Sequence, residues 1–355
     1  MMNTKTAYTG AKAFVDEFLS GLEDREQEVL RSRYGLNGGE PETLQAIGNR
    51  YGITRERVRQ IEAGALVNLR RKTDHPYLAS FVEAASGRLK SVGGAEREDG
   101  FMENFARLTG HRGAVAEFAS AAKFLLELSG KVLSFRDSYG NDWHDYWYLT
   151  AADKKQLQSF ISKFESVMKG RKEEVLLGGK FDSVFDEVAR TARMPQAAAK
   201  NYLAISKRFG VSPFGQTGLV SWSEVNPRTA RDWAYLILKK EQKPLHFTEL
   251  SKIIKDYRKG KRTNLQTVHN ELIKDDRFVL VGRGMYGLKE HGYIPGTAKE
   301  IISHILKNNG PLRSREIISL VKEQRFFKEG TILINLQNRR NFQSLPDGRY
   351  TLREA

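Results

Sequence analysis

Residues 22–71 read LEDREQEVLRSRYGLNGGEPETLQAIGNRYGITRERVRQIEAGALVNLRR, and they form the most regular stretch of the chain. The pattern predicts a short helix over 43–51, a tight turn at Gly52 and a longer helix capped by Thr54. The apolar positions of the longer helix recur at steps of three and four residues: Val58, Ile61, Ala65, Leu66 and Leu69. Two helices joined by a Gly-containing turn form a helix-turn-helix, whose second helix normally enters the major groove of DNA.

The polar face of that second helix carries side chains that can read base edges. Its N-terminal end, which normally lies nearest the bases, holds Arg55, Glu56, Arg57, Arg59 and Gln60. Arginine can donate two hydrogen bonds to guanine, glutamate can accept one from cytosine, and glutamine can pair with adenine. An exposed, charged helix without a ligand is the alternative. The preceding helix and turn favour DNA reading.

The string TRERVRQIEAGAL, Thr54–Leu66, resembles the signature of region 4 of the sigma-70 family, and the resemblance extends over residues 22–71. It implies recognition of double-stranded promoter DNA at the upstream, −35 element. Two sets of contacts are implied: base contacts from Arg55, Glu56 and Gln60, and backbone contacts from Thr54, Arg57 and Arg59.

The same resemblance implies that the helix before the turn docks on the flap of the β subunit of core RNA polymerase. The residues expected to make this contact are Glu26, Leu30 and Tyr34.

The chain departs from the family in two respects. Gly64, Val67 and Asn68 stand where the family usually carries several basic residues. Few residues precede the segment, so we do not expect the aromatic-rich region with which a full sigma factor melts the −10 element.

Residues 228–290 predict three helices followed by a β-hairpin over 278–288, the order of a winged helix. This segment resembles the HARE-HTH domain, a winged helix shared by chromatin factors, restriction systems and the δ subunit of RNA polymerase. The resemblance rests on PLHF at 244–247 and GRGMYGL at 282–288. Members of that class bind nucleic acid or polymerase, and the resemblance does not choose between the two. Arg283, at the tip of the hairpin, is the candidate for a DNA backbone contact.

The pattern repeats over residues 296–355, which predict a second winged helix. GPL at 310–312 echoes KPL at 243–245, and DGRYTL at 347–352 echoes the hairpin. The stretch 239–262 holds nine Lys or Arg against three acids. It is either a surface that follows phosphates or a solvated face.

The middle of the chain is less regular. Trp143 and Tyr146–Tyr148 are interpreted as packing residues rather than a base-stacking platform, because no basic residue interleaves them. Lys200 and Lys207 are further candidates for phosphate contacts.

These patterns together predict a mainly α fold of tandem helix-turn-helix and winged-helix domains with small β-hairpin wings. The expected organisation is a sigma region 4-like helix-turn-helix at 11–73, a linker at 74–100, a helical domain that could be a further winged helix at 101–180, a helix-turn-helix-like segment and connector at 181–227, the HARE-HTH winged helix at 228–290 and the second winged helix at 296–355.

Composition limits the function. The chain has 58 Lys and Arg against 43 Asp and Glu, a formal charge of +15, which is typical of proteins with a polyanionic partner. It has no cysteine, which excludes disulfides and Cys-ligated zinc. We expect no signal peptide, no membrane contact, no metal and no cofactor, and a cytoplasmic, nucleoid-associated protein.

Two functions follow as hypotheses. The first is a sequence-specific, sigma factor-like transcription protein that acts with RNA polymerase in initiation or its regulation. The second is a polymerase-associated, δ-like accessory subunit without autonomous sequence reading. An enzyme is not expected, because the sequence shows no acidic triad, P-loop or nucleophile–base pair.

Overall fold

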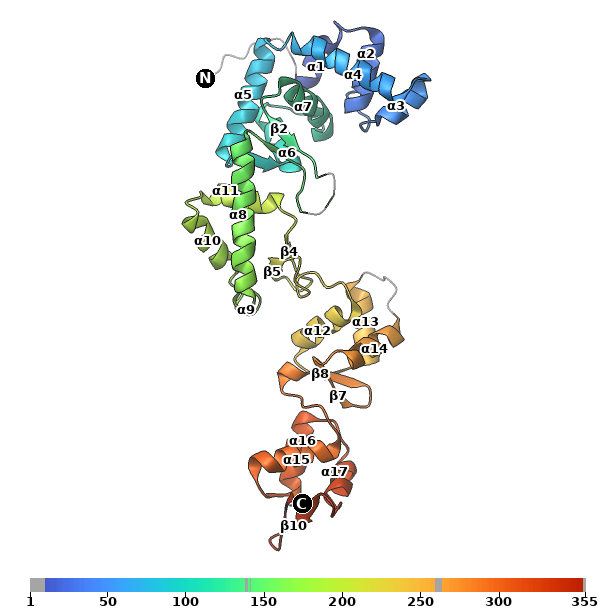
Figure 1. Ribbon diagram of the computed structural model, residues 1–355, viewed down its shortest axis with the longest axis vertical. Coiled ribbons are helices and arrows are strands. Elements are labelled where there is room, and N and C mark those ends of the chain that lie inside the picture. The colour runs from blue at the N-terminus through green and yellow to red at the C-terminus, as the bar shows by residue number, and fades with distance from the viewer. Residues whose placement is uncertain (1–9, 138–139, 141, 259–263, 354–355) are drawn as a thin grey trace. The chain divides into compact units, whose positions relative to one another are not determined.

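The computed structural model describes residues 10–137, 140, 142–258 and 264–353. The fold is mainly α, as predicted, with seventeen α-helices and small β-sheets among those residues (Figure 1). The chain divides into two compact units, Met1–Gly210 with Gln216–Val220 and Val211–Gly215 with Ser221–Ala355. In the described part, no helix is both long and apolar enough to cross a membrane. The prediction about a signal peptide falls largely on residues 1–9, which lie outside the described residues.

The first unit begins with four helices: α1 (Ala11–Leu19), α2 (Asp24–Tyr34), α3 (Leu44–Tyr51) and α4 (Arg55–Arg70). Helices α2, α3 and α4 enclose a small core of their own, in which Val29, Ile47 and Val58 are fully buried. This core fixes α3 and α4 as the two helices of the expected helix-turn-helix.

A second arrangement occurs three times along the described chain, in the order helix, strand, helix, helix, strand, strand. We call each occurrence a module. The first module consists of α5 (Pro76–Ser91), β1 (Ala95–Arg97), α6 (Glu98–Leu108), α7 (Val115–Ser129), β2 (Leu133–Phe135) and β3 (Tyr146–Tyr148). Its last strand lies between the other two and pairs antiparallel with both, so that Tyr148 faces Ala95 on one side and Leu133 on the other.

The second and third modules belong to the second unit. The second consists of α12 (Ala230–Glu241), β6 (Leu245–His246), α13 (Phe247–Tyr257), α14 (Leu265–Lys274), β7 (Phe278–Gly282) and β8 (Met285–Leu288), followed by η1 (Lys289–His291). The third consists of α15 (Ala298–Asn309), β9 (Leu312–Arg313), α16 (Ser314–Gln324), α17 (Glu329–Leu336), β10 (Phe342–Ser344) and β11 (Arg349–Leu352). Both sheets again place their last strand in the middle.

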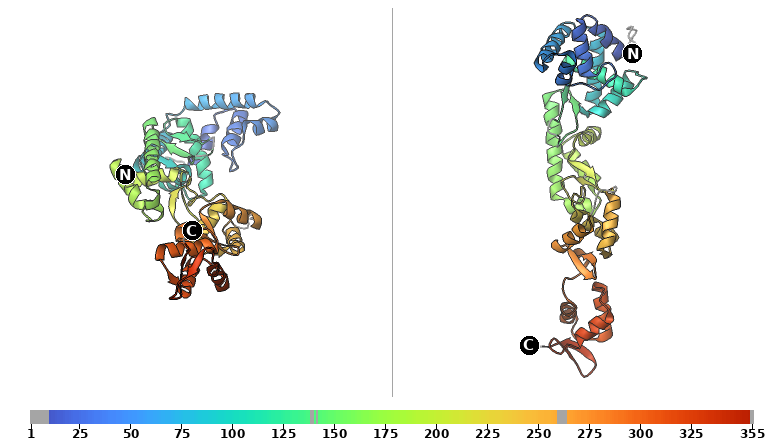
Figure 2. Two further views of the ribbon diagram at one scale, coloured as in Figure 1. Left: turned by 60° about the horizontal axis from the view of Figure 1, so that its bottom comes forward. Right: turned by 90° about the vertical axis from the view of Figure 1, so that its right-hand side faces the viewer.

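The remaining elements are α8 (Ala151–Gly170), α9 (Lys172–Leu176), α10 (Phe181–Thr191), α11 (Gln196–Ile205), β4 (Phe209–Val211) and β5 (Thr217–Leu219). They belong to the first unit except for Val211, the last residue of β4. Helix α8 is the long light-green helix of Figure 2. Helix α11 packs against β1, where Asn201 Nδ2 donates to the Val92 carbonyl at 3.1 Å and Tyr202 Oη donates to the Gly93 carbonyl.

The predicted linker at 74–100 is wrong. This segment contains α5 and β1, which begin the first module and are part of the core. Leu78, Phe81, Ala85 and Leu89 recur at steps of three and four residues and are buried. The Gly- and Glu-rich composition of 86–100 obscured this spacing, so the predicted domain at 101–180 starts after the first two elements of its module and includes α8, which follows the module.

The four N-terminal helices and the first module share one hydrophobic core. Helix α7 packs against α1, α2 and α4. Leu30 of α2, Leu69 of α4 and Phe124 of α7 are fully buried in this core. The rings of Tyr34 and Phe124 meet edge to face with centroids 5.1 Å apart. The helix-turn-helix therefore depends on α7, which begins at Val115, whereas α4 ends at Arg70.

We predict that Phe124→Ala destabilises both parts of this shared core together. Truncation of a buried phenylalanine lowers the free energy of unfolding by about 3–5 kcal/mol. Hydrogen exchange should show lost protection in α2–α4 as well as in α5–α7. Phe185→Ala, a truncation of a buried ring of α10 that lies outside this core, is the matched control and should leave α2–α4 protected. Unchanged protection of α2–α4 in Phe124→Ala would contradict the shared core.

Candidate nucleic-acid interface

Side-chain caps set the start of both helices of the helix-turn-helix. Thr43 Oγ1 accepts a hydrogen bond from the Ala46 amide at 3.1 Å, and Thr54 Oγ1 accepts one from the Arg57 amide at 3.1 Å. Each cap satisfies an amide that has no partner within its own helix. Gly52 ends α3 at a φ of +65°, a left-handed conformation that glycine adopts without a steric penalty. Thr54, predicted to touch the DNA backbone, is exposed at this N-terminus.

Gly48 allows the turn to come close to α3. A Cβ atom at this position would lie 2.7 Å from the Ile53 carbonyl oxygen. Gly64 is the opposite case, because nothing lies within 4 Å of a Cβ atom added there. Gly48 thus has a steric role in the helix-turn-helix, whereas Gly64 leaves the surface of α4 open.

The predicted base-reading residues share one exposed face of α4 and are connected there. Arg59 donates to both carboxylate oxygens of Glu56, from Nε at 2.9 Å and from Nη2 at 2.7 Å. Gln60 Nε2 donates to Glu56 Oε1 at 3.5 Å, and Arg57 Nη1 donates to Gln60 Oε1 at 3.3 Å. Arg55 is exposed and has no hydrogen bond or ion pair within the described part of the chain.

This network orders side chains that would otherwise be mobile. The hydrogen bonds from Arg59 lower the pKa of the Glu56 carboxyl, and the same bonds raise the pKa of the Arg59 guanidinium. Glu56 is therefore a carboxylate at neutral pH and is held by Arg59. Arg55 remains available to a base edge, since a bidentate contact to guanine needs its guanidinium free.

A shallow groove runs beside this face, with a volume of about 280 Å³. Its lining joins the start of α2 to the middle of α4 and consists of Glu23, Arg25, Glu26, Ile53, Arg57, Gln60, Ile61 and Gly64. Two predicted DNA contacts, Arg57 and Gln60, and one predicted polymerase contact, Glu26, thus lie along the same groove.

The three predicted polymerase contacts have different surroundings. Glu26 is half-buried and accepts a hydrogen bond from the Glu23 amide at 3.2 Å, as part of a capping box. Tyr34 is half-buried against Phe124. Leu30 is fully buried in the shared core, so the prediction of a contact through Leu30 is corrected: helical spacing placed it on α2, but α7 covers that side of the helix.

The other candidate contacts differ in their exposure. Arg283 is exposed at the turn between β7 and β8. Lys200 is exposed, whereas Lys207 is half-buried and its Nζ lies 3.8 Å from the Asp137 carboxylate. Of the basic stretch 239–262, residues 259–262 lie outside the described residues.

The interpretation of the aromatic cluster as packing is confirmed. Tyr146 and Trp147 are fully buried, and Trp143 is nearly so. The Trp147 indole Nε1 donates to Glu98 Oε2 at 3.0 Å. These three rings cannot stack on bases, whereas Tyr148, the fourth aromatic residue of the cluster, is half-buried, with Lys154 Nζ 5.6 Å from the centre of its ring.

The positive charge is unevenly distributed, which residue-by-residue reasoning missed. Residues 228–355 hold 26 Lys and Arg against 14 Asp and Glu, whereas residues 1–227 hold 32 against 29. Most of the excess that indicates a polyanionic partner therefore lies in the second and third modules. A count by segment would have found it.

Comparison with known proteins agrees with the geometry of the helix-turn-helix. Residues 18–71 match the family model of Sigma-70, region 4. These residues carry a sigma-70 region 4 domain. The chain is also similar to the RNA polymerase sigma factor SigA of Listeria monocytogenes and that of Listeria innocua, each 46% identical over 77 residues. That match covers 22% of this chain, and the chain spans only 21% of the length of each SigA. The region 4 domain is a DNA-binding helix-turn-helix.

We predict opposite effects for two glycine substitutions in this domain. Gly48→Ala brings a methyl group against the Ile53 carbonyl and should lower the free energy of unfolding by about 1–3 kcal/mol. Gly64→Ala meets no neighbour and should raise it by up to about 1 kcal/mol, because alanine is the better helix former. Urea unfolding of both variants is the measurement. Equal effects of the two changes would contradict the steric role of Gly48.

We predict that the stability of the N-terminal core falls in alkaline solution because of Tyr34. Burial raises the pKa of Tyr34 to about 12, and the carboxylates of Glu127 and Glu62 add to the rise. In the folded protein this phenol keeps its proton between about pH 10 and 12, while the unfolded chain releases it. The contribution of the buried, protonated Tyr34 to the free energy of unfolding is therefore fully present below about pH 10 and is lost as the pH rises from about 10 to 12.

Tyr34→Phe should thus lose less stability than the unmodified protein between about pH 10 and 12. Urea midpoints at several pH values for the two proteins measure this. Parallel curves would show that Tyr34 is not the responsible group.

Proposed function

We propose that this protein is a sequence-specific, sigma factor-like transcription protein that reads a −35-type promoter element through α4. It acts with RNA polymerase in transcription initiation or its regulation. The observation that carries this proposal is the exposed, ordered face of α4 in a region 4 domain. In this proposal Arg55, Glu56 and Gln60 read bases, and the backbone is contacted by Thr54, Arg57 and Arg59.

We further propose that each module is a winged helix. The order helix, strand, helix, helix, strand, strand supports this, because a hairpin that follows three helices forms the wing. The second module, with its neighbours over 228–290, would be the HARE-HTH domain, and 296–355 a second winged helix. Their excess positive charge would supply sequence-independent affinity for DNA, with Arg283 of the wing as one backbone contact.

The proposed partner besides promoter DNA is core RNA polymerase, through the β flap. Glu26 and the groove beside α4 support a protein contact at the start of α2. Because the protein would work on chromosomal DNA, we place it in the cytoplasm, at the nucleoid.

One observation favours the second candidate, a δ-like accessory subunit of polymerase. Helix α17 occupies the place of the DNA-reading helix in its module but contains no Lys or Arg. Its Ile334 is 70% exposed, and Ile273 on α14 is 63% exposed. Exposed apolar side chains on helices of this position suit a protein partner better than phosphates.

Two substitutions on α4 test the proposed function. Arg55→Ala should cost about 1–3 kcal/mol on the preferred sequence and relax specificity at one base position. Arg57→Ala should weaken binding to all sequences and lower the slope of log affinity against log salt by about 1. Binding of the full chain to preferred and scrambled duplexes, at several salt concentrations, measures both. Equal losses on both duplexes for Arg55→Ala would contradict base reading and leave the accessory-subunit candidate.

A further inference from the structure

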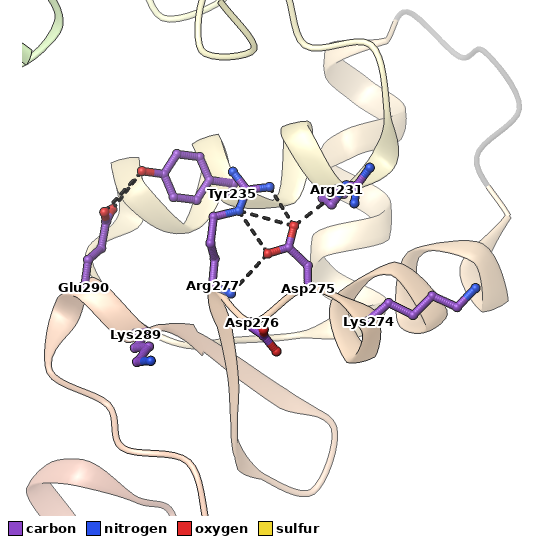
Figure 3. Close-up of a pocket in the computed structure, with 8 residues that line it drawn as sticks. All are labelled: Arg231, Tyr235, Lys274, Asp275, Asp276, Arg277, Lys289 and Glu290. Carbon is purple, nitrogen blue, oxygen red and sulfur yellow. Dashed lines mark hydrogen bonds and ion pairs between the residues drawn. The ribbon is translucent and has the colours of Figure 1, made fainter. Parts of the chain in front are cut away.

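The second module contains a cavity of about 720 Å³ that none of the proposed contacts uses (Figure 3). It lies between the first turns of α12, the end of α14 and the segment that follows β8. Its lining consists of Arg231, Tyr235, Lys274, Asp275, Asp276, Arg277, Lys289 and Glu290. These residues flank the open end of the β7–β8 hairpin, whereas Arg283 lies at its turn, so the cavity is separate from the wing tip.

One guanidinium in the cavity is held in a fixed orientation. Arg277 donates to Asp275 from Nε at 3.0 Å and from Nη2 at 2.7 Å (Figure 3). Its guanidinium carbon lies 4.6 Å from the centre of the Tyr235 ring. The side chain of Arg277 is nevertheless 40% exposed, while that of Asp275 is 11% exposed. A planar cation fixed on one side and open on the other is preorganised for an oxyanion.

The carboxylates of the cavity are mostly engaged by other groups. Asp275 holds Arg277, and its carboxylate also lies 3.7 Å from Arg231. Glu290 accepts from the Tyr235 hydroxyl at 3.2 Å and lies 3.7 Å from Lys239. Asp276 is exposed and has no ion pair among the described residues.

Two lysines at the cavity have no such partner. In the described part of the chain, no carboxylate lies within 4 Å of the ammonium groups of Lys274 and Lys289. The lining residues and their ion-pair partners Lys239 and Glu271 together supply five cations against four carboxylates. The excess is one positive charge, which balances the single negative charge of one phosphodiester.

We propose that this cavity binds a backbone phosphate of nucleic acid, with Lys274 and Lys289 as charge partners and Arg277 as the oriented donor. This proposal rests on the proposed DNA binding of the chain, and the site would add to the sequence-independent part of its affinity for DNA. It also gives the second module a second contact with the backbone, at the opposite end of the hairpin from Arg283.

The double substitution Lys274→Gln with Lys289→Gln in the full chain tests the site on a duplex of scrambled sequence. Each phosphate that the protein neutralises contributes about 0.9 to the slope of log affinity against log salt, so the loss of this one contact should lower the slope by about 0.9. Lys155→Gln with Lys163→Gln, which removes two exposed lysines of α8 outside the cavity and outside the basic stretch 239–262, is the control and should change the slope little. An equal fall in the control would overturn the proposal.

Asp276→Asn provides a test that a misfolded protein cannot mimic. Removal of this unpaired carboxylate should tighten binding to the scrambled duplex, because it takes a negative charge from the lining of the cavity. Unchanged or weaker binding would count against the site.

The remaining outcomes separate the source of the phosphate and the class of the partner. Inorganic phosphate, compared with chloride at equal ionic strength, should raise the melting temperature of the unmodified chain no more than that of the double variant. A larger rise in the unmodified chain would assign the cavity to free phosphate and overturn the role in backbone binding.

Weaker binding of the double variant to core polymerase, with an unchanged salt slope on DNA, would overturn the proposal in favour of a protein partner. Failure of the unmodified chain to bind any duplex would instead defeat the proposed function itself.

Discussion

The packing of α7 against α1, α2 and α4 is the contact on which the N-terminal unit depends. By themselves, helices α2, α3 and α4 bury little apolar surface, and their own core consists mainly of Val29, Ile47 and Val58. The first module supplies the missing partner by burying Leu30 and Phe124 together. The exposed face of α4 that carries Arg55, Glu56 and Gln60 is thereby fixed to a larger folded unit. The side of α2 that packs against α7 is buried and cannot contact another protein.

The same module order serves two purposes in this chain. In the first module the third helix, α7, is covered by the region 4 domain and carries a run of buried apolar residues. In the second and third modules the corresponding helices, α14 and α17, bury only two residues each and leave Ile273 and Ile334 exposed. One architecture thus acts as a structural support near the N-terminus and as a free surface near the C-terminus. The charge follows this division, since the surplus of Lys and Arg lies mainly in residues 228–355.

The helix-turn-helix was predictable because its signals are local. Caps at Thr43 and Thr54 and the left-handed Gly52 act within a few residues, and the spacing of Val58 and Leu69 marks the buried face of α4. The two incorrect predictions, a linker at 74–100 and an accessible Leu30, have a different cause. Both depend on packing between segments far apart in the sequence, and periodicity shows that a helix has an apolar side without showing what covers it.

The cavity of the second module could not be predicted for a similar reason. Arg231 and Arg277 are separated by most of a module and meet only when α12 packs beside the end of α14. The aromatic cluster shows the reverse case, in which a local pattern was sufficient: the absence of interleaved basic residues indicated packing, and Tyr146 and Trp147 are buried.

The measurement that tests the central claim most directly is selection of a random double-stranded DNA pool by the purified full chain, with and without core RNA polymerase, at physiological salt. The account predicts enrichment of one motif by the chain alone, and loss of preference at one position of that motif in Arg55→Ala. Binding to polymerase with no enriched motif, alone or in the complex, would contradict it and identify the chain as an accessory subunit.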